Sequence, residues 1–164
     1  MDRKRSKSSR THYGRYAHGG IEMLIYELTH IFFRYEGKMV CSPKNLGLYY
    51  SYESVQNAIQ YYSAQPGFCE NQDAFSVRER NVIGNIVDNT VFEVVIYLHS
   101  EDYEFETEIE LGLYGDKVTA QGKLVKYCRD NSTLVTSRNL IFEKIINKCI
   151  IERMEWSEGF SVSE

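Results

Sequence analysis

One stretch of the chain alternates strictly enough to define its local structure. From Tyr103 to Leu113 every second residue is hydrophobic or Thr. The intervening positions hold four carboxylates: Glu104, Glu106, Glu108 and Glu110. A period of two places successive side chains on opposite faces of a strand, so the pattern predicts a strand with one buried and one acidic face. Residues 91–99 are rich in β-branched and aromatic side chains and predict a second strand beside it.

Short polar turns connect these strands to a third predicted strand at residues 118–128. The turns lie at residues 100–102 and at Gly115-Asp116. Successive strands joined by short turns form an antiparallel meander. Residues 21–35 combine an apolar stripe at helical spacing with a strand-like content of Ile, Tyr, Phe and Thr, so their pattern fits either a helix or a strand.

Two segments predict helices. Residues 51–63 begin with Ser51, a suitable N-cap, and carry a one-sided apolar set: Val55, Ala58, Ile59 and Tyr62. Residues 137–149 begin with Ser137 and carry a similar set: Phe142, Ile145, Ile146 and Cys149. The following residues, up to 156, either extend that helix or form a short last strand. Residues 66–90 have no steady period and predict a long loop or a mobile insertion. The expected class is α+β, with an antiparallel sheet packed against two helices on one side.

Charge is distributed unevenly along the chain. Residues 1–20 hold one acid and six basic groups: Arg3, Lys4, Arg5, Lys7, Arg10 and Arg15. Their net charge is therefore +5, while residues 21–164 hold the remaining 13 basic and 22 acidic groups, a net charge of −9. The first segment also lacks apolar periodicity, which predicts a disordered basic arm over residues 1–20. Residues 21–164 are expected to form a single domain, which begins after Gly19-Gly20.

Composition is typical of a globular protein. Hydrophobic residues make up 43% of the 164 residues and charged residues 26%. No apolar run approaches the roughly 20 residues of a transmembrane helix, and the first apolar stretch follows a polar leader. Four widely spaced Cys argue against a disulfide scaffold. We therefore expect a soluble intracellular chain.

Motifs that carry catalysis are missing from the sequence. The phosphate-binding glycine loops, the G-x-S-x-G nucleophile motif and the H-E-x-x-H metal motif are all absent. The four Cys never form a C-x-x-C pair. We expect no enzymatic activity, no cofactor and no bound metal.

The basic arm is the clearest functional signal. Its six cations can neutralise phosphates of RNA or of anionic lipid head groups, and a basic tail of this kind also resembles a nuclear import signal. The four alternating glutamates fit a solvated sheet face best. They also offer an acidic surface for a basic partner, including the arm of another copy, and so predict self-association.

A resemblance to rhabdovirus matrix proteins, above all the small ones of the plant-infecting cytoplasmic branch, lies in three stretches. They are SYESVQNAIQYY, NTVFEVVIYLHSED and SRNLIFEKIINKCIIERMEW. The order of basic arm, long first strand, helix, loop, meander, helix and short last strand also resembles that family, and it implies a strand at residues 21–35. One feature departs from many animal members: Pro43 and Pro66 are the only prolines, so no P-P-x-Y budding motif is present.

The resemblance implies a structural viral protein. Such a protein would self-associate, condense the ribonucleoprotein and link it to the inner face of the envelope through residues 3–15. It would be found in the virion and in the host cytoplasm at membranes, with entry into the nucleus if host import factors bind the arm. Two other functions fit the sequence. One is a small immunity or inhibitor protein with an acidic surface for a basic toxin. The other is a viral silencing suppressor that binds double-stranded RNA, against which the acidic body argues.

Overall fold

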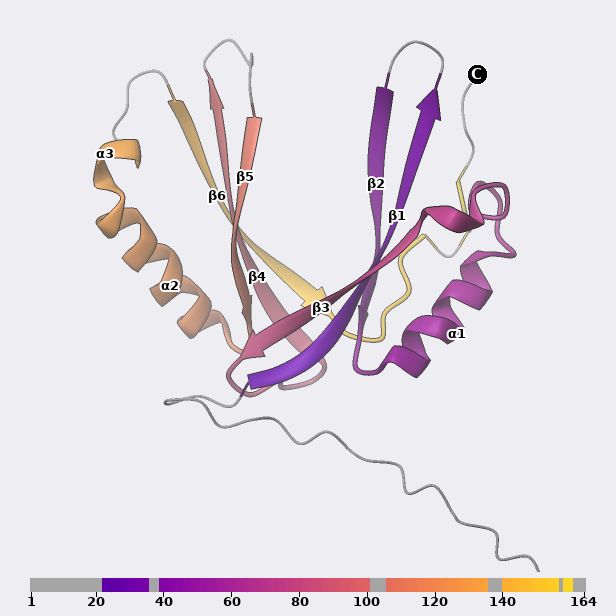
Figure 1. Cartoon of the computed structure of the whole chain (residues 1–164). Coiled ribbons are helices and arrows are strands. Elements are labelled where there is room, and N and C mark those ends of the chain that lie inside the picture. Colours follow the sequence, from indigo (N-terminus) through magenta and orange to yellow (C-terminus); the bar gives the residue numbers. More distant parts are fainter. Residues whose placement is uncertain (1–21, 36–38, 101–105, 136–139, 157, 161–164) are drawn as a thin grey trace, which may run out of the picture.

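In a computed structural model the chain forms a curled, six-stranded mixed sheet with helices on its outer side (Figure 1). The structure describes residues 22–35, 39–100, 106–135, 140–156 and 158–160. The strands are β1 (Glu22–Tyr35), β2 (Met39–Tyr49), β3 (Phe75–Ile83), β4 (Thr90–Ser100), β5 (Glu106–Tyr114) and β6 (Leu140–Ile150). The helices are α1 (Tyr52–Tyr62), α2 (Lys117–Asp130), the four-residue α3 (Ser132–Val135) and a 3-10 turn at Gln72–Ala74. The α+β class is confirmed, although the sheet is mixed rather than purely antiparallel.

The sheet consists of two three-stranded limbs. Its order is β2-β1-β3-β5-β4-β6, and every neighbouring pair is antiparallel except β3 and β5. Those two strands run parallel and share only two residue pairs, Val82 with Leu113 and Ile83 with Tyr114. Beyond these pairs the limb β2-β1-β3 and the limb β5-β4-β6 diverge, as Figure 1 shows.

At their joined end the limbs curl until the two edge strands meet. Leu48 of β2 forms a parallel bridge with Ile151, the residue that follows β6. Each strand or its adjoining residue gives one side chain to a buried apolar layer there: Ile25, Leu48, Val82, Val91, Leu113 and Ile151. We call the side of the sheet that carries this layer the inner face. The C-terminal segment holds the two limbs together, because the Glu152 amide donates to the Leu48 carbonyl at 2.7 Å.

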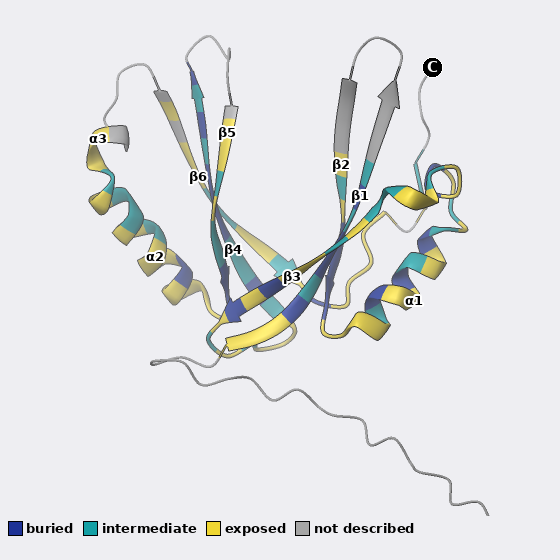
Figure 2. Cartoon of the chain, viewed as in Figure 1, coloured by how far each residue is buried: buried dark blue, intermediate teal, exposed yellow. Residues whose placement is uncertain are grey.

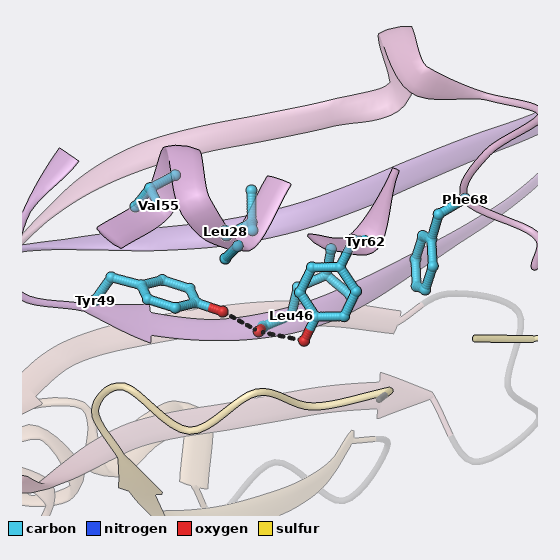
Figure 3. Close-up of a cluster of buried hydrophobic side chains, with 7 residues drawn as sticks. Leu28, Leu46, Tyr49, Val55, Tyr62 and Phe68 are labelled. Atoms are coloured by element: carbon cyan, nitrogen blue, oxygen red, sulfur yellow. Dashed lines mark hydrogen bonds between the residues drawn. The ribbon is translucent and has the colours of Figure 1, made fainter. Parts of the chain in front are cut away.

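Both larger helices pack on the opposite, outer face, with their inward sides buried (Figure 2). Helix α1 covers β1 and β2 through Val55, Ala58 and Tyr62. The phenol groups of Tyr49 and Tyr62 both donate to the Leu46 carbonyl, at 2.9 and 3.2 Å (Figure 3). Helix α2 covers the other limb. The expected placement of two helices on one side of the sheet therefore holds, although the second helix lies in a different part of the chain.

Three local predictions are confirmed. Residues 52–62 are helical and Ser51 caps them, since its side chain accepts from the Ser54 amide at 3.1 Å. The strands expected at 91–99 and 103–114 correspond to β4 and β5, which form an antiparallel pair, and residues 103–105 lie outside the described residues. Residues 22–35 form a strand, so the helical interpretation of that segment is wrong.

The third predicted strand is wrong, because residues 117–130 form helix α2. Asp116 caps it, with one carboxylate oxygen accepting from the Thr119 amide at 2.8 Å and the other from the Thr119 hydroxyl at 2.7 Å. Ala120 is buried and Leu124 packs beside it, a spacing that suits a helix. The neighbour that β4 gains on its other side is β6 instead.

The helix predicted at 137–149 is also wrong, since residues 140–150 form β6. This segment pairs with β4 from Thr90 opposite Ile150 to Ser100 opposite Leu140. A full antiparallel ladder between two strands rich in Val and Ile outweighs an apolar stripe that merely matches helical spacing. The predicted cap, Ser137, lies outside the described residues.

The long loop predicted at 66–90 contains a strand. Residues 75–83 form β3, which pairs with β1 throughout.

The alternation of β5 changes face near the C-terminal end of that strand. A bulge in β5 opposite Val94 and Val95 coincides with a positive φ of 118° at Gly112. As a result Leu111 packs beside the α2 cluster, whereas Leu113 enters the inner layer. The hydrophobic residues from Tyr103 to Leu113 therefore do not share one face throughout.

Candidate interaction site on the inner face

Directly above the apolar inner layer lies a cluster of charged side chains from four adjacent strands. We call it the inner ion cluster: Glu27 of β1, Arg78 and Arg80 of β3, Glu93 of β4 and Glu110 of β5. The strand registers explain why they meet. Ile25 lies opposite Arg80 and Glu27 lies opposite Arg78, so all four side chains project from the inner face. Glu93 lies opposite Leu113, which places it on the same face.

Arg80 is the centre of this cluster. Only 7% of its side chain is exposed, and it contacts three carboxylates. Its Nη1 lies 2.7 Å from Glu27 Oε2, its Nη2 lies 3.4 Å from Glu93 Oε1, and Nη2 also contacts Glu110. A buried guanidinium is tolerated only when its donors are satisfied, and these contacts supply that compensation.

Arg78 occupies the solvent side of the cluster. Its side chain is 57% exposed, and two of its nitrogens donate to Glu27 Oε2 at 2.7 and 2.9 Å. It also reaches Glu110 of β5 at 3.0 Å. Because β3 and β5 share only two residue pairs, the contacts of Arg78 and Arg80 with Glu110 bridge the two limbs where their backbones have begun to separate.

The cluster contains three carboxylates and two guanidinium groups, so it carries an excess of negative charge. Burial raises the pKa of Glu93, and the positive charge of Arg80 and a hydrogen bond from Asn147 oppose that rise. The same environment acts on the neighbouring thiol. Burial, together with the charges of Glu93 and Glu27, raises the pKa of Cys149 to about 11, which keeps it protonated at neutral pH. A protonated thiol is a poor nucleophile, so the cluster provides no activated sulfur.

Two of the four predicted glutamates can be placed. Glu108 and Glu110 share the inner face of β5, as their alternation predicted, because they lie opposite Tyr97 and Val95. Glu110 is held by both arginines, whereas Glu108 is exposed and makes no ion pair with any described residue. Glu104 and the side chain of Glu106 lie outside the described part of the chain. The same holds for all six arm cations: Arg3, Lys4, Arg5, Lys7, Arg10 and Arg15.

Arg78 and Arg80 are the site residues that the sequence analysis missed. They lie in the segment interpreted as a loop, and their acidic partner Glu27 is about fifty residues away along the chain. A signal was present in the alternation of Arg78, Arg80 and Val82, which places all three on one face of a strand. Because arginines are polar, the alternation does not show that they face inward unless their acidic partner is known.

Neither a metal-binding cluster nor a membrane-spanning helix is found among the described residues. No group of three or more His, Cys, Asp or Glu within them is arranged to hold a metal ion. None of the helices described there is long and apolar enough to cross a membrane. No protein-family model matches the chain, and no curated protein or solved structure shows a significant similarity to it.

Proposed function

We propose that this chain is a structural, non-enzymatic protein of the rhabdovirus matrix type. It self-associates, condenses the viral ribonucleoprotein and links it to the inner face of the envelope. The observation that carries the proposal is the separation of charge along the chain, with a net +5 in residues 1–20 and −9 in the remainder. One molecule thus holds a cationic segment for phosphates and an acidic body for basic partners.

The arm is the part proposed to contact the membrane and the ribonucleoprotein. Each cation close to an anionic membrane contributes about 1 kcal/mol of attraction, so six of them support reversible binding. Residues 3–15 offer no apolar anchor, which keeps that binding dependent on salt. Host import factors are further candidate partners for the arm, and the proposed locations are the virion and membranes in the host cytoplasm, with the nucleus as another.

Self-association is proposed to join the arm of one copy to the inner face of another. Glu108 supports this, because it is exposed beside an ion cluster that already contains one carboxylate more than its guanidinium groups can balance. Glu110 contributes less, since Arg78 and Arg80 neutralise it. Glu104 and Glu106 continue the same alternation along the sequence and are proposed to take part.

The test compares the native chain with a full-length variant in which the six arm cations are replaced by Gln. Sedimentation with phosphatidylserine vesicles and light scattering at 50 mM salt measure membrane binding and assembly. The native chain should pellet with the vesicles and form oligomers, and the variant should do neither. A native chain that remains monomeric and does not sediment with the vesicles would contradict the proposal. It would favour an inhibitor that holds one basic protein on its acidic surface.

A further inference from the structure

The outer face of the second limb carries several exposed cations of a body whose net charge is negative. Helix α2 carries four of them: Lys117, Lys123, Lys126 and Arg129. Strand β6 adds Lys144 and Lys148, which are also exposed. We call these six residues the basic outer face. They are six of the 13 basic residues that follow residue 20, in a segment whose net charge is −9.

The fold explains why these side chains share one side of the molecule. Helix α2 packs on β4, β5 and β6 through Ala120 and Leu124, so residues on its other side point to solvent. Ile146 of β6 packs against the same cluster. Lys144 and Lys148 lie two residues before and after it, and therefore project from the outer face beside α2.

The lysines of α2 are available for a ligand. Among the described residues, no carboxylate lies within ion-pair distance of Lys117, Lys123 or Lys126. Arg129 meets only its exposed neighbour Asp130, at 3.3 Å. This contrasts with the inner ion cluster, in which each arginine contacts at least two carboxylates.

Within the described part of the chain, few acids lie on this side of the limb. Asp116 is engaged by the amide and hydroxyl of Thr119 at the start of α2. Glu143 lies opposite Tyr97 on the inner face, where it is 3.8 Å from His99. Among the described residues the charge of this face is therefore net positive, although the net charge of the body is −9.

We propose that the basic outer face binds the phosphate backbone of a nucleic acid. Lys117 and Arg129 are twelve residues apart along α2, about 18 Å at the helical rise of about 1.5 Å per residue. Lys144 and Lys148 extend over about 13 Å of β6 at about 3.3 Å per residue. Exposed cations spread over these lengths suit a chain of regularly spaced phosphates, without sequence preference.

A lipid surface fits the same residues less well. A helix that lies on a bilayer inserts an apolar face, and the apolar face of α2 is already packed on the sheet. Its exposed apolar residues are only Val118 and Val125, at 78% and 67% exposure, and no aromatic residue accompanies them on that side. The inference goes beyond the proposed function, since it concerns the folded body and holds whatever residues 1–20 bind.

The experiment measures fluorescence anisotropy of a labelled single-stranded RNA oligonucleotide of about 20 nucleotides, long enough for several phosphate contacts. Full-length native chain is compared with Lys123→Gln/Lys126→Gln. Loss of two phosphate contacts should weaken binding by about tenfold or more at 50 mM salt and make the log–log salt slope shallower by about 1.4. Lys144→Gln/Lys148→Gln should act in the same direction. Circular dichroism melts establish that both variants remain folded.

The matched control removes one exposed cation elsewhere on the body. Arg153→Gln deletes a charge that is 3.5 Å from Glu155 on the C-terminal segment, so RNA affinity should stay within about twofold of the native value. Unchanged affinity and salt slope in the α2 variant would overturn the proposal. So would a native chain whose RNA binding disappears when only the arm cations are replaced. Vesicle binding that is lost in the α2 variant while RNA binding persists would identify a lipid surface instead.

Discussion

Arg80 of β3 and Glu27 of β1 form an ion pair of 2.7 Å, with only 7% and 9% of their side chains exposed. The pair lies directly above the apolar layer that joins the two limbs, and Arg80 continues from it to carboxylates of β4 and β5. This guanidinium therefore contacts acids from both limbs. Its loss would leave buried Glu93 without a counter-charge among the described residues. Glu27 and Glu110, on either side of the split between β3 and β5, would keep only the exposed Arg78.

Replacing Arg80 should be far more damaging than replacing its neighbour. Arg80→Met leaves Glu93 buried without a guanidinium partner and Glu27 with only the exposed Arg78, which costs about 3–5 kcal/mol of unfolding free energy. Arg78→Met removes a side chain that is 57% exposed and should cost at most about 1 kcal/mol. Urea denaturation of the two variants measures the difference. Equal losses would show that Arg80 is not the centre of the cluster.

Glu93→Gln should gain stability relative to the native chain as the pH rises. Burial raises the pKa of Glu93, so the folded state binds its proton more readily than the unfolded state does. The contribution of Glu93 to stability is therefore greatest at low pH and is lost as the pH rises above the ordinary Glu value of about 4.3 and through the raised pKa. Gln cannot ionise. The test is the difference in unfolding free energy between variant and native chain at pH 4 and at pH 7, and a difference independent of pH would refute it.

His30 should make the fold less stable below neutral pH. Its side chain is fully buried against Phe68 and Phe75, its Nε2 donates to the Asn71 carbonyl at 2.9 Å, and its Nδ1 has no hydrogen-bond partner. Burial lowers its pKa, and the nearby charge of Lys44 acts in the same direction. The unfolded chain then binds a proton at about pH 6.5 that the folded chain does not, so stability falls as the pH drops below that value.

His30→Phe isolates this effect, because Phe suits the surrounding aromatic rings and has no titrating group. Melting temperatures of native chain and variant between pH 7 and pH 5 provide the comparison. The native chain should lose more stability than the variant over this range. A parallel decline in both would assign the acid sensitivity to other groups.

The elements that local pattern predicted correctly are those with a signal inside their own residues. Ser51 and the stripe behind it specify α1, and alternation specifies much of β5. Segments 118–128 and 137–149 were predicted wrongly because each contains features typical of a helix and features typical of a strand. In the first, the helix N-cap formed by Asp116 outweighs the β-branched residues, which favour a strand. In the second, the ladder with β4 decided for a strand, and that partner is distant in sequence.

The same reasoning explains what was predictable about the surfaces. Alternation was sufficient to place Glu108 and Glu110 on one face. The alternation could not predict that Arg78 and Arg80 neutralise Glu110, because β3 and β5 are neighbours only through the curled topology. The basic side of α2 was hidden for a related reason, since a segment read as a strand would have divided its lysines between two faces.

Self-association should depend on Glu108 more than on Glu110 and should weaken with salt. Glu108 is exposed without an ion pair among the described residues, whereas Glu110 is already bound by two arginines. Exposed charge pairs contribute about 0–1 kcal/mol each, so only several of them together hold an arm on the inner face. Salt screens their attraction, beyond about 8 Å at physiological ionic strength. Assembly should therefore fall steeply as salt rises from about 50 to about 500 mM. Light scattering should show a larger loss of oligomers for Glu108→Gln than for Glu110→Gln, with Glu104→Gln/Glu106→Gln adding to the first. Glu110→Gln also loosens the inner ion cluster, so its melting temperature separates a folding effect from an assembly effect. Oligomers that persist at high salt and in Glu108→Gln would mean that the contact is apolar, and exposed tyrosines such as Tyr52 and Tyr61 would then be the residues to replace.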